Sequence, residues 1–169
     1  LSFKNLLAKE KHEFKGIKLK NYEINLDLKK LKEYKFLFEK KINSIPIVFS
    51  NGRITFYDKK NYVAKVDDAN IKLKIIEDSI EANLKGEFLD DNIYVNLNRE
   101  KIVNNKVSTD IILKMAKNNF FIKANLINFE KNKDITSGNF LIKKDKNQLT
   151  AIFDYKNNEL IINKSNLRN

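Results

Sequence analysis

The side chains that could take part in catalysis are few. His12 is the one histidine of the chain, and it lies between Lys11 and Glu13 in a polar stretch. A catalytic triad built on it would need a serine at a strained turn, and no serine has that setting. We therefore interpret His12 as a surface residue. The absence of cysteine excludes disulfides, thiolate metal sites and cysteine nucleophiles.

Two acidic pairs, Asp67-Asp68 and Asp90-Asp91, are the obvious places to look for carboxylate chemistry or a metal ion. Both fall where strands are expected to turn or begin, and aspartate at such places commonly bonds its own backbone. The spacing of a calcium loop is missing. The four glycines are isolated, so no phosphate-binding loop is formed. We expect no catalytic residue, no metal site and no cofactor, and an enzyme is the least favoured function.

What dominates the chain is an alternation of apolar and polar residues. Apolar residues occupy every second position in Ile71, Leu73, Ile75; Ile80, Ala82, Leu84; and Ile93, Val95, Leu97. The same pattern returns in Val107, Thr109, Ile111, Leu113; Phe120, Ile122, Ala124, Leu126; Leu149, Ala151, Phe153, Tyr155; and Leu160, Ile162. A period of two is typical of strands with one dry and one wet face. Repeated with short polar breaks, it predicts an antiparallel sheet with a single apolar face.

The breaks between apolar segments place the elements. We expect strands near 44–50, 52–58, 62–76, 79–89, 92–98, 106–115, 119–128, 138–144, 148–155 and 158–163. The breaks, such as Ser50-Asn51-Gly52, are mostly short, so neighbouring strands should form hairpins. Asparagine rather than glycine should supply the turn conformations. Further strand-like alternation starts at Phe14, and Asn21 interrupts its phase. Short helices are expected at 1–13 and 27–38, the second capped by Asp27.

The predicted fold is therefore mostly β: one large antiparallel meander sheet in a single domain, 1–169, strongly curled, with one or two short helices near the N-terminus. Large sheets curl or split into packed layers. A half-closed sandwich would fill its apolar face with protein, whereas an open trough could hold acyl chains there. The pattern fits both. The residues expected to line such a lipid groove are Ile71, Leu73, Ile80, Leu84, Ile93, Val95, Ile111, Leu113, Phe120 and Ile122.

The charge of the chain bounds its partners. The net charge is +11, yet Arg53, Arg99 and Arg168 are the only arginines among 33 basic residues. Nucleic-acid binders favour arginine because its planar guanidinium contacts phosphates and bases with two hydrogen bonds. They also need aromatic residues on the wet face, where Tyr94 and Tyr57 are the clear candidates. We expect no nucleic-acid partner. The lysines suit a solvated surface or contact with an anionic membrane surface.

Residues 45 to 98 resemble the AsmA family of bacterial envelope proteins. The resemblance rests on Ile45-Pro-Ile-Val-Phe-Ser-Asn-Gly-Arg-Ile-Thr-Phe-Tyr-Asp58, on Val66-Asp-Asp-Ala-Asn-Ile-Lys-Leu73 and on Ser79-Ile-Glu-Ala-Asn-Leu-Lys-Gly-Glu-Phe88. Ala124-Asn-Leu-Ile-Asn-Phe129 looks like a second version of the last element, and Ser165-Asn-Leu-Arg-Asn169 looks like the start of another layer. These motifs cover about a third of the chain and contain no catalytic residue.

The resemblance implies a groove-like β-structure in the bacterial periplasm, carried by a protein with one N-terminal helix in the inner membrane. It also implies a role in outer-membrane biogenesis and the movement of phospholipid along an apolar trough. No apolar run in this chain reaches the length of a membrane span, so we expect a periplasmic segment of a longer protein.

Three functions remain open. The first is a lipid conduit or lipid-binding segment whose apolar groove holds phospholipid acyl chains. The second is a structural or interaction module with a protein-filled core, whose edge strands pair with adjacent segments or with a partner protein. The third, a basic nucleic-acid binder, would bind DNA or RNA with steep salt dependence.

Overall fold

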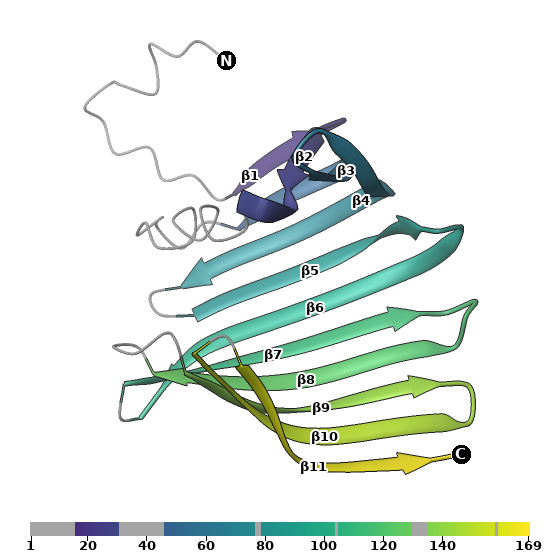
Figure 1. Ribbon diagram of the computed structural model, residues 1–169. Coiled ribbons are helices and arrows are strands. Elements are labelled where there is room, and N and C mark those ends of the chain that lie inside the picture. Colours follow the sequence, from purple (N-terminus) through teal and green to yellow (C-terminus); the bar gives the residue numbers. More distant parts are fainter. Residues whose placement is uncertain (1–15, 31–45, 77–78, 104, 130–134, 158) are drawn as a thin grey trace.

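The computed structural model describes residues 16–30, 46–76, 79–103, 105–129, 135–157 and 159–169. Within them, eleven strands form one sheet, and β3 to β11 follow one another as an antiparallel meander (Figure 1). The strands are β1 (Ile17–Lys20), β2 (Glu23–Asp27), β3 (Ile47–Asp58), β4 (Asn61–Ile76), β5 (Ser79–Phe88), β6 (Asp91–Ile102), β7 (Lys106–Met115), β8 (Phe120–Phe129), β9 (Thr136–Lys144), β10 (Asn147–Lys156) and β11 (Glu159–Arg168). The sheet does not close: β1 lies at one end of the strand order and β11 at the other.

The predicted mostly-β meander is confirmed, with strands β4 to β11 close to their expected positions. Two expectations about its start were wrong. Residues 47–50 of the first expected strand and the whole of 52–58 belong to one strand, β3, because Asn51 adopts a positive φ of 54° and produces a bulge instead of a turn. In addition, β1 and β2 pair with β3 in parallel, not antiparallel. Asn21, with a φ of 53°, separates β1 from β2, in agreement with the predicted interruption.

The helix predictions are only partly covered by the described residues. Residues 1–13 lie outside them, as does most of 27–38. The described part of the second segment is a single 3₁₀ turn, Leu28–Lys30, whose Lys29 N–H donates a hydrogen bond of 3.0 Å to Asp27 Oδ1. Asp27 therefore caps a turn, as expected of a residue with a short acceptor side chain.

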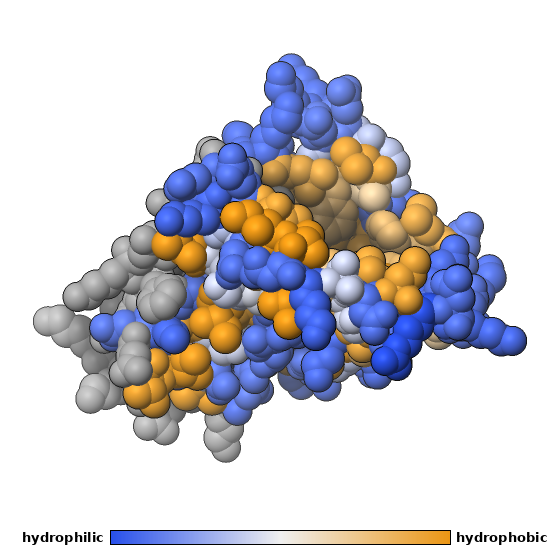
Figure 2. All heavy atoms as spheres, turned by 60° about the horizontal axis from the view of Figure 1, so that its bottom comes forward, coloured by the Kyte–Doolittle hydropathy of each residue, from blue (hydrophilic) through white to orange (hydrophobic). Residues whose placement is uncertain are grey.

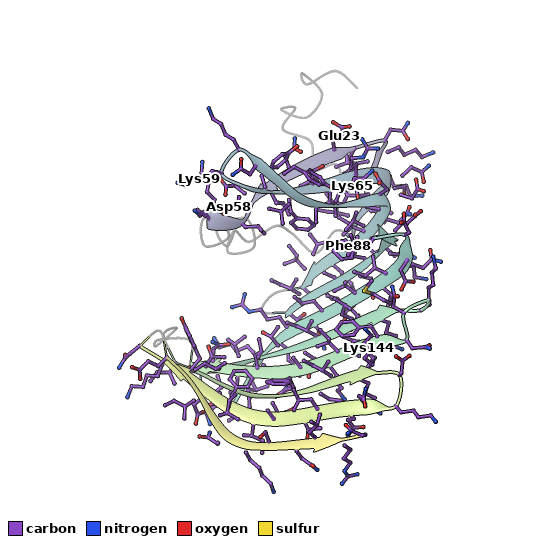
Figure 3. The ribbon with its side chains drawn as sticks, turned by 45° about the vertical axis from the view of Figure 1, so that its right-hand side comes forward. Glu23, Asp58, Lys59, Lys65, Phe88 and Lys144 are labelled. Carbon is purple, nitrogen blue, oxygen red and sulfur yellow. The ribbon has the colours of Figure 1, made fainter. Side chains whose placement is uncertain are left out.

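The sheet curls because its first two long strands, β3 and β4, bend. The β3–β4 register shifts at Phe49, Gly52 and Ile54, and the β4–β5 register shifts between Asp67 and Asn70. Such bulges bend a strand and increase its twist. Figure 3 shows the result: the N-terminal strands curve over the rest of the sheet, which becomes concave on one side.

The core lies under this curved end. Ile54, Val66, Ala69 and Ile93 form its buried centre. Partly buried apolar residues pack around them: Tyr22, Ile24, Leu26, Phe56, Ile71, Leu84, Phe88, Val95, Leu113 and Met115. Apart from Tyr22, which directly precedes β2, these residues come from β2 to β7, including strands that are not neighbours in the sheet. The beginning of the sheet is thus folded back onto the concave face of β5 to β7.

Candidate functional site: the concave apolar face

Strand register aligns the alternating apolar residues into continuous rows on the concave face. The longest row crosses eight strands through Ile71, Leu84, Val95, Leu113, Ile122, Ile142, Leu149 and Leu167. The next row runs through Leu73, Ala82, Leu97, Ile111, Ala124, Phe140, Ala151 and Ser165. At about 4.8 Å per strand, the first row spans roughly 34 Å. This row of side chains is the candidate site.

All ten residues predicted to line the groove lie on this face. Five of them, Ile71, Leu84, Val95, Leu113 and Ile122, belong to the longest row, and Leu73 and Ile111 to the next. Ile80 lies in a third row, opposite Ile75, and Ile93 and Phe120 both pair with Met115 in a fourth. The structure therefore brings the predicted set together, as a period of two requires.

The structure divides the ten predicted residues into covered and uncovered ones, because other parts of the protein cover part of the concave face. Ile80 and Ile93 are buried, and Ile71, Leu84, Val95 and Leu113 pack against the core cluster. The fit is tight at Gly86, which pairs with Ile93. A Cβ added at Gly86 would lie 2.6 Å from Val66 Cγ1 and 2.8 Å from the Asp67 carbonyl oxygen. These six predicted residues thus serve as core in the described structure.

The part of the concave face that the core cluster does not cover, called the open part below, lies further along the chain, over β8 to β11. Here the longest row continues with Ile122, Ile142 and Leu149, which are half-buried, and ends at Leu167, which is 68% exposed. On β11, Leu160 and Ile162 are 59% and 46% exposed. Figure 2, turned to bring the C-terminal edge of the sheet forward, shows apolar side chains around a hollow with hydrophilic residues beside it.

Aromatic residues shape this open region. Phe153 pairs with Gly138, and an added Cβ there would lie 3.1 Å from the Phe153 ring and 2.5 Å from the Asn125 carbonyl oxygen. The centroid of the Phe153 ring lies 6.0 Å from the centroid of the Phe140 ring. The predicted groove set omitted these residues and Ile142, Leu149 and Leu167. The alternation of Phe140, Ile142, Leu149 and Phe153 was visible in the sequence, whereas Leu167 reaches this face only through a bulge in β11. The coverage that separates these residues from the core residues is a tertiary feature.

Polar residues border the apolar rows at both ends of the strands. At one end the concave face carries Arg99, Thr109 and Lys101, and at the other it carries Lys144 and Asn147. Figure 3 shows Lys144 at the end of its strand. An apolar centre with basic borders suits an amphipathic anion, because hydrocarbon and charge find separate surroundings.

The convex face is less uniformly polar than predicted. Asn83 Oδ1 accepts hydrogen bonds from the Tyr94 hydroxyl (3.0 Å) and Asn96 Nδ2 (2.9 Å). The ring of Tyr94 also lies 5.9 Å from Lys85 Nζ. Among apolar residues, Ile112, Ile127 and Leu141 are half-buried on this face, and Ile152 is 50% exposed. The expectation of a single apolar face is therefore wrong for β7 to β10, where apolar residues occupy both phases.

In each acidic pair, one carboxylate has structural partners. Asp91 is 1% exposed, and its carboxylate accepts hydrogen bonds of 2.9 Å from the backbone N–H groups of Lys117 and Asn118 and from Asn118 Nδ2. Burial alone would raise the pKa of Asp91, but these hydrogen bonds hold it below its usual value. Asp91 thus ties the β5–β6 turn to the β7–β8 turn.

Asp67 lies at the bulge of β4 between two cations. Its Oδ1 is 2.6 Å from Arg53 Nε, and its Oδ2 is 2.5 Å from Lys65 Nζ. Hydrogen bonds from Lys65 and Arg53 lower the pKa of Asp67. A shallow polar depression at the Arg53–Asp67 ion pair is lined by Asn21, Tyr22, Glu23, Asn51, Gly52, Arg53, Asp67 and Asp68. In the described part of the chain, no three His, Cys, Asp or Glu side chains gather as metal ligands would.

No helix among the described residues is long and apolar enough to cross a bilayer. His12 lies outside the described residues. No family model, no curated protein and no solved structure matches this chain, so its function must be inferred from the sheet itself.

Proposed function

We propose that this chain is a non-enzymatic, lipid-binding segment of an AsmA-like envelope protein, in which the concave face of the sheet holds or conducts phospholipid acyl chains. The observation that carries the proposal is the uninterrupted apolar row from Ile71 to Leu167, which is covered by protein at its first strands and uncovered at its last. The setting proposed is the bacterial periplasm, in a protein anchored in the inner membrane and involved in outer-membrane biogenesis.

The dimensions of the open region support this proposal. From Ile122 on β8 to Leu167 on β11 the row crosses three strand spacings, or roughly 14 Å. One leaflet of a bilayer's hydrocarbon core is about 15 Å thick. The open region is therefore about as long as one acyl chain in a membrane. Each buried CH₂ stabilises the bound lipid by about 0.8 kcal/mol, and the basic border at Lys144 can contact a phosphate headgroup.

The test is native mass spectrometry of the protein purified from cells, followed by uptake of a fluorescent phospholipid from vesicles. We expect bound phospholipid in the wild-type protein and its loss in Leu149→Asp, because that carboxylate would stand in the middle of the open row. Val95→Asp is a poorer test, since Val95 packs against the core.

Ile152→Asp is the matched control. It places the same charge three residues further along β10 but on the convex face, where Ile152 is 50% exposed. Both variants should keep the circular dichroism spectrum of the parent. If the wild-type protein carries no lipid and takes none up, or if folded Leu149→Asp binds as well as Ile152→Asp, the proposed function is wrong.

A second candidate is an interaction module that pairs through an edge strand. The observation that favours it is β11, which has one strand neighbour in the described sheet and ten exposed residues. A clean lipid-free mass together with concentration-dependent association would favour this alternative.

A further inference from the structure

The strand β11 forms one long edge of the described sheet. Among the described residues β11 pairs only with β10, and every residue from Glu159 to Arg168 is exposed. An exposed edge is a template for another strand, and proteins commonly blunt it with proline, short length or inward-pointing charges. On its concave side β11 presents Leu160, Ile162, Ser165 and Leu167, with neither proline nor charge. The opposite edge strand, β1, has only four residues.

A bulge sets which residues of β11 share a face. Ile162 pairs with Phe153 and Lys164 pairs with Ile152, so Asn163 is the extra residue. Leu160 and Leu167 are seven positions apart, and in a regular strand they would point to opposite faces. Because of the bulge, both point to the concave face, opposite Tyr155 and Leu149 respectively.

This geometry makes β11 complementary to itself. When two copies of β11 run antiparallel about a two-fold axis between Asn163 and Lys164, Leu160 lies opposite Leu167 and Ile162 lies opposite Ser165. Glu159 then lies opposite Arg168 on the convex face. Each pairing occurs twice, and opposite charges directly across a strand pair are favourable. If this register is shifted by one or two residues in either direction, at least one concave-side residue lies opposite a convex-side residue. The proposed register is therefore the one of the five in which every residue lies opposite a residue of its own face.

We propose that β11 is a homodimerisation edge at which a second copy of this chain continues the sheet in this register. The concave faces of the two copies then lie on the same side. The row that ends at Leu149 and Leu167 passes on to Leu160 and Tyr155 of the second copy, so two open regions join into one longer apolar face. The inference does not rest on lipid binding, because strand pairing uses the backbone edge of β11 and lipid would contact the face.

Charge exchange at the ends of β11 provides the first test. The association constant is measured by analytical ultracentrifugation over a range of protein concentrations. Glu159→Arg and Arg168→Glu alone should each weaken dimerisation about tenfold, because each creates two like-charged pairs. The double variant Glu159→Arg/Arg168→Glu should restore dimerisation. A monomer at every concentration, or a dimer indifferent to all three variants, overturns the proposal.

Disulfide trapping tests the register itself, since the chain has no cysteine of its own. In Leu160→Cys/Leu167→Cys, the two positions of one strand are about 23 Å apart, so a disulfide must join two chains. Directly opposed residues lie about 4.5–5.5 Å apart at Cα, within the range that a disulfide spans. Leu160→Cys/Ser165→Cys is the control, because neither cysteine then faces another. Equal crosslinking of both variants, or none in the first, overturns the register. Circular dichroism of each variant confirms folding.

Discussion

Replacing Gly86 with alanine tests whether the sheet folds back onto itself. None of the described glycines has a positive φ, so Gly86 is not needed for its backbone conformation. Space is the requirement: a Cβ would meet Val66 Cγ1 at 2.6 Å, the Asp67 carbonyl oxygen at 2.8 Å and Ala69 Cα at 3.3 Å. Two of these three atoms belong to the backbone of β4. They cannot move aside by a side-chain rotation, so β4 itself must shift.

The expected loss follows from that overlap. Forcing one extra methyl into a well-packed core costs about 1–3 kcal/mol. For a chain of this length, about 2 kcal/mol lowers the midpoint of thermal unfolding by about 4–8 °C. Urea unfolding followed by circular dichroism gives the free energy of unfolding of Gly86→Ala and of the parent.

Gly16→Ala is the matched control. Gly16 is exposed, and an added Cβ would meet one atom within 4 Å, the Pro46 carbonyl oxygen at 3.3 Å. We expect its free energy of unfolding to stay within about 0.5 kcal/mol of the parent. Gly86→Ala as stable as Gly16→Ala would refute the close approach of β4 to β5, and with it the covered end of the groove.

Two further predictions separate core from surface and test the Asp91 hydrogen bonds. Ile93→Ala should lower the free energy of unfolding by about 2–5 kcal/mol, whereas Leu167→Ala on the exposed edge should change it by less than about 0.5 kcal/mol. Similar losses in urea unfolding would contradict the division of the concave face into a core part and a surface part. Because the pKa of Asp91 is lowered in the folded protein, its stabilising contribution is present above the usual carboxyl pKa of about 3.9 and is lost as pH falls through the folded value. Asp91→Asn should therefore be less stable than the parent at pH 7 and should lose less stability between pH 7 and pH 3, as measured by urea unfolding at both; parallel losses in the two proteins would show that Asp91 does not carry this pH dependence.

The meander could be predicted because its information is local. In β5, Ile80, Ala82 and Leu84 alternate with polar residues, and short breaks force the next strand to turn back. The start of the sheet could not be predicted in the same way. Asn51 and Gly52 look like a hairpin turn, yet they form a bulge because Ile54 continues to pair with Val66 in a bent strand. That outcome depends on the packing of Tyr22 over Gly52, which is remote in sequence.

The sequence predicted which residues share the concave face, but it did not predict which of them are covered by protein. A period of two places Leu84 and Ile122 on the same side whatever covers them. Whether each becomes core or lining depends on the fold-back of β3 and β4, which brings Ile54 and Phe56 over the first strands and not the last. The same sequence pattern therefore means core at one end of the row and candidate binding surface at the other. Most of the ten predicted residues lie on β4 to β7, the strands that are covered.

β11 exposes two different features: a backbone edge that can pair with another strand, and apolar side chains on the concave face. Different occupants would cover them. Leu160, Ile162 and Leu167 keep 46–68% of their surface accessible, and covering that surface is favourable by about 25 cal/mol per Å². A second copy paired at β11 satisfies the backbone groups of the edge but leaves the concave face open. An acyl chain covers the face but offers the backbone groups no hydrogen bonds. The two occupants therefore do not compete. In that case the dimer would have the longer apolar face, and Leu149→Asp would abolish lipid binding without weakening the dimer.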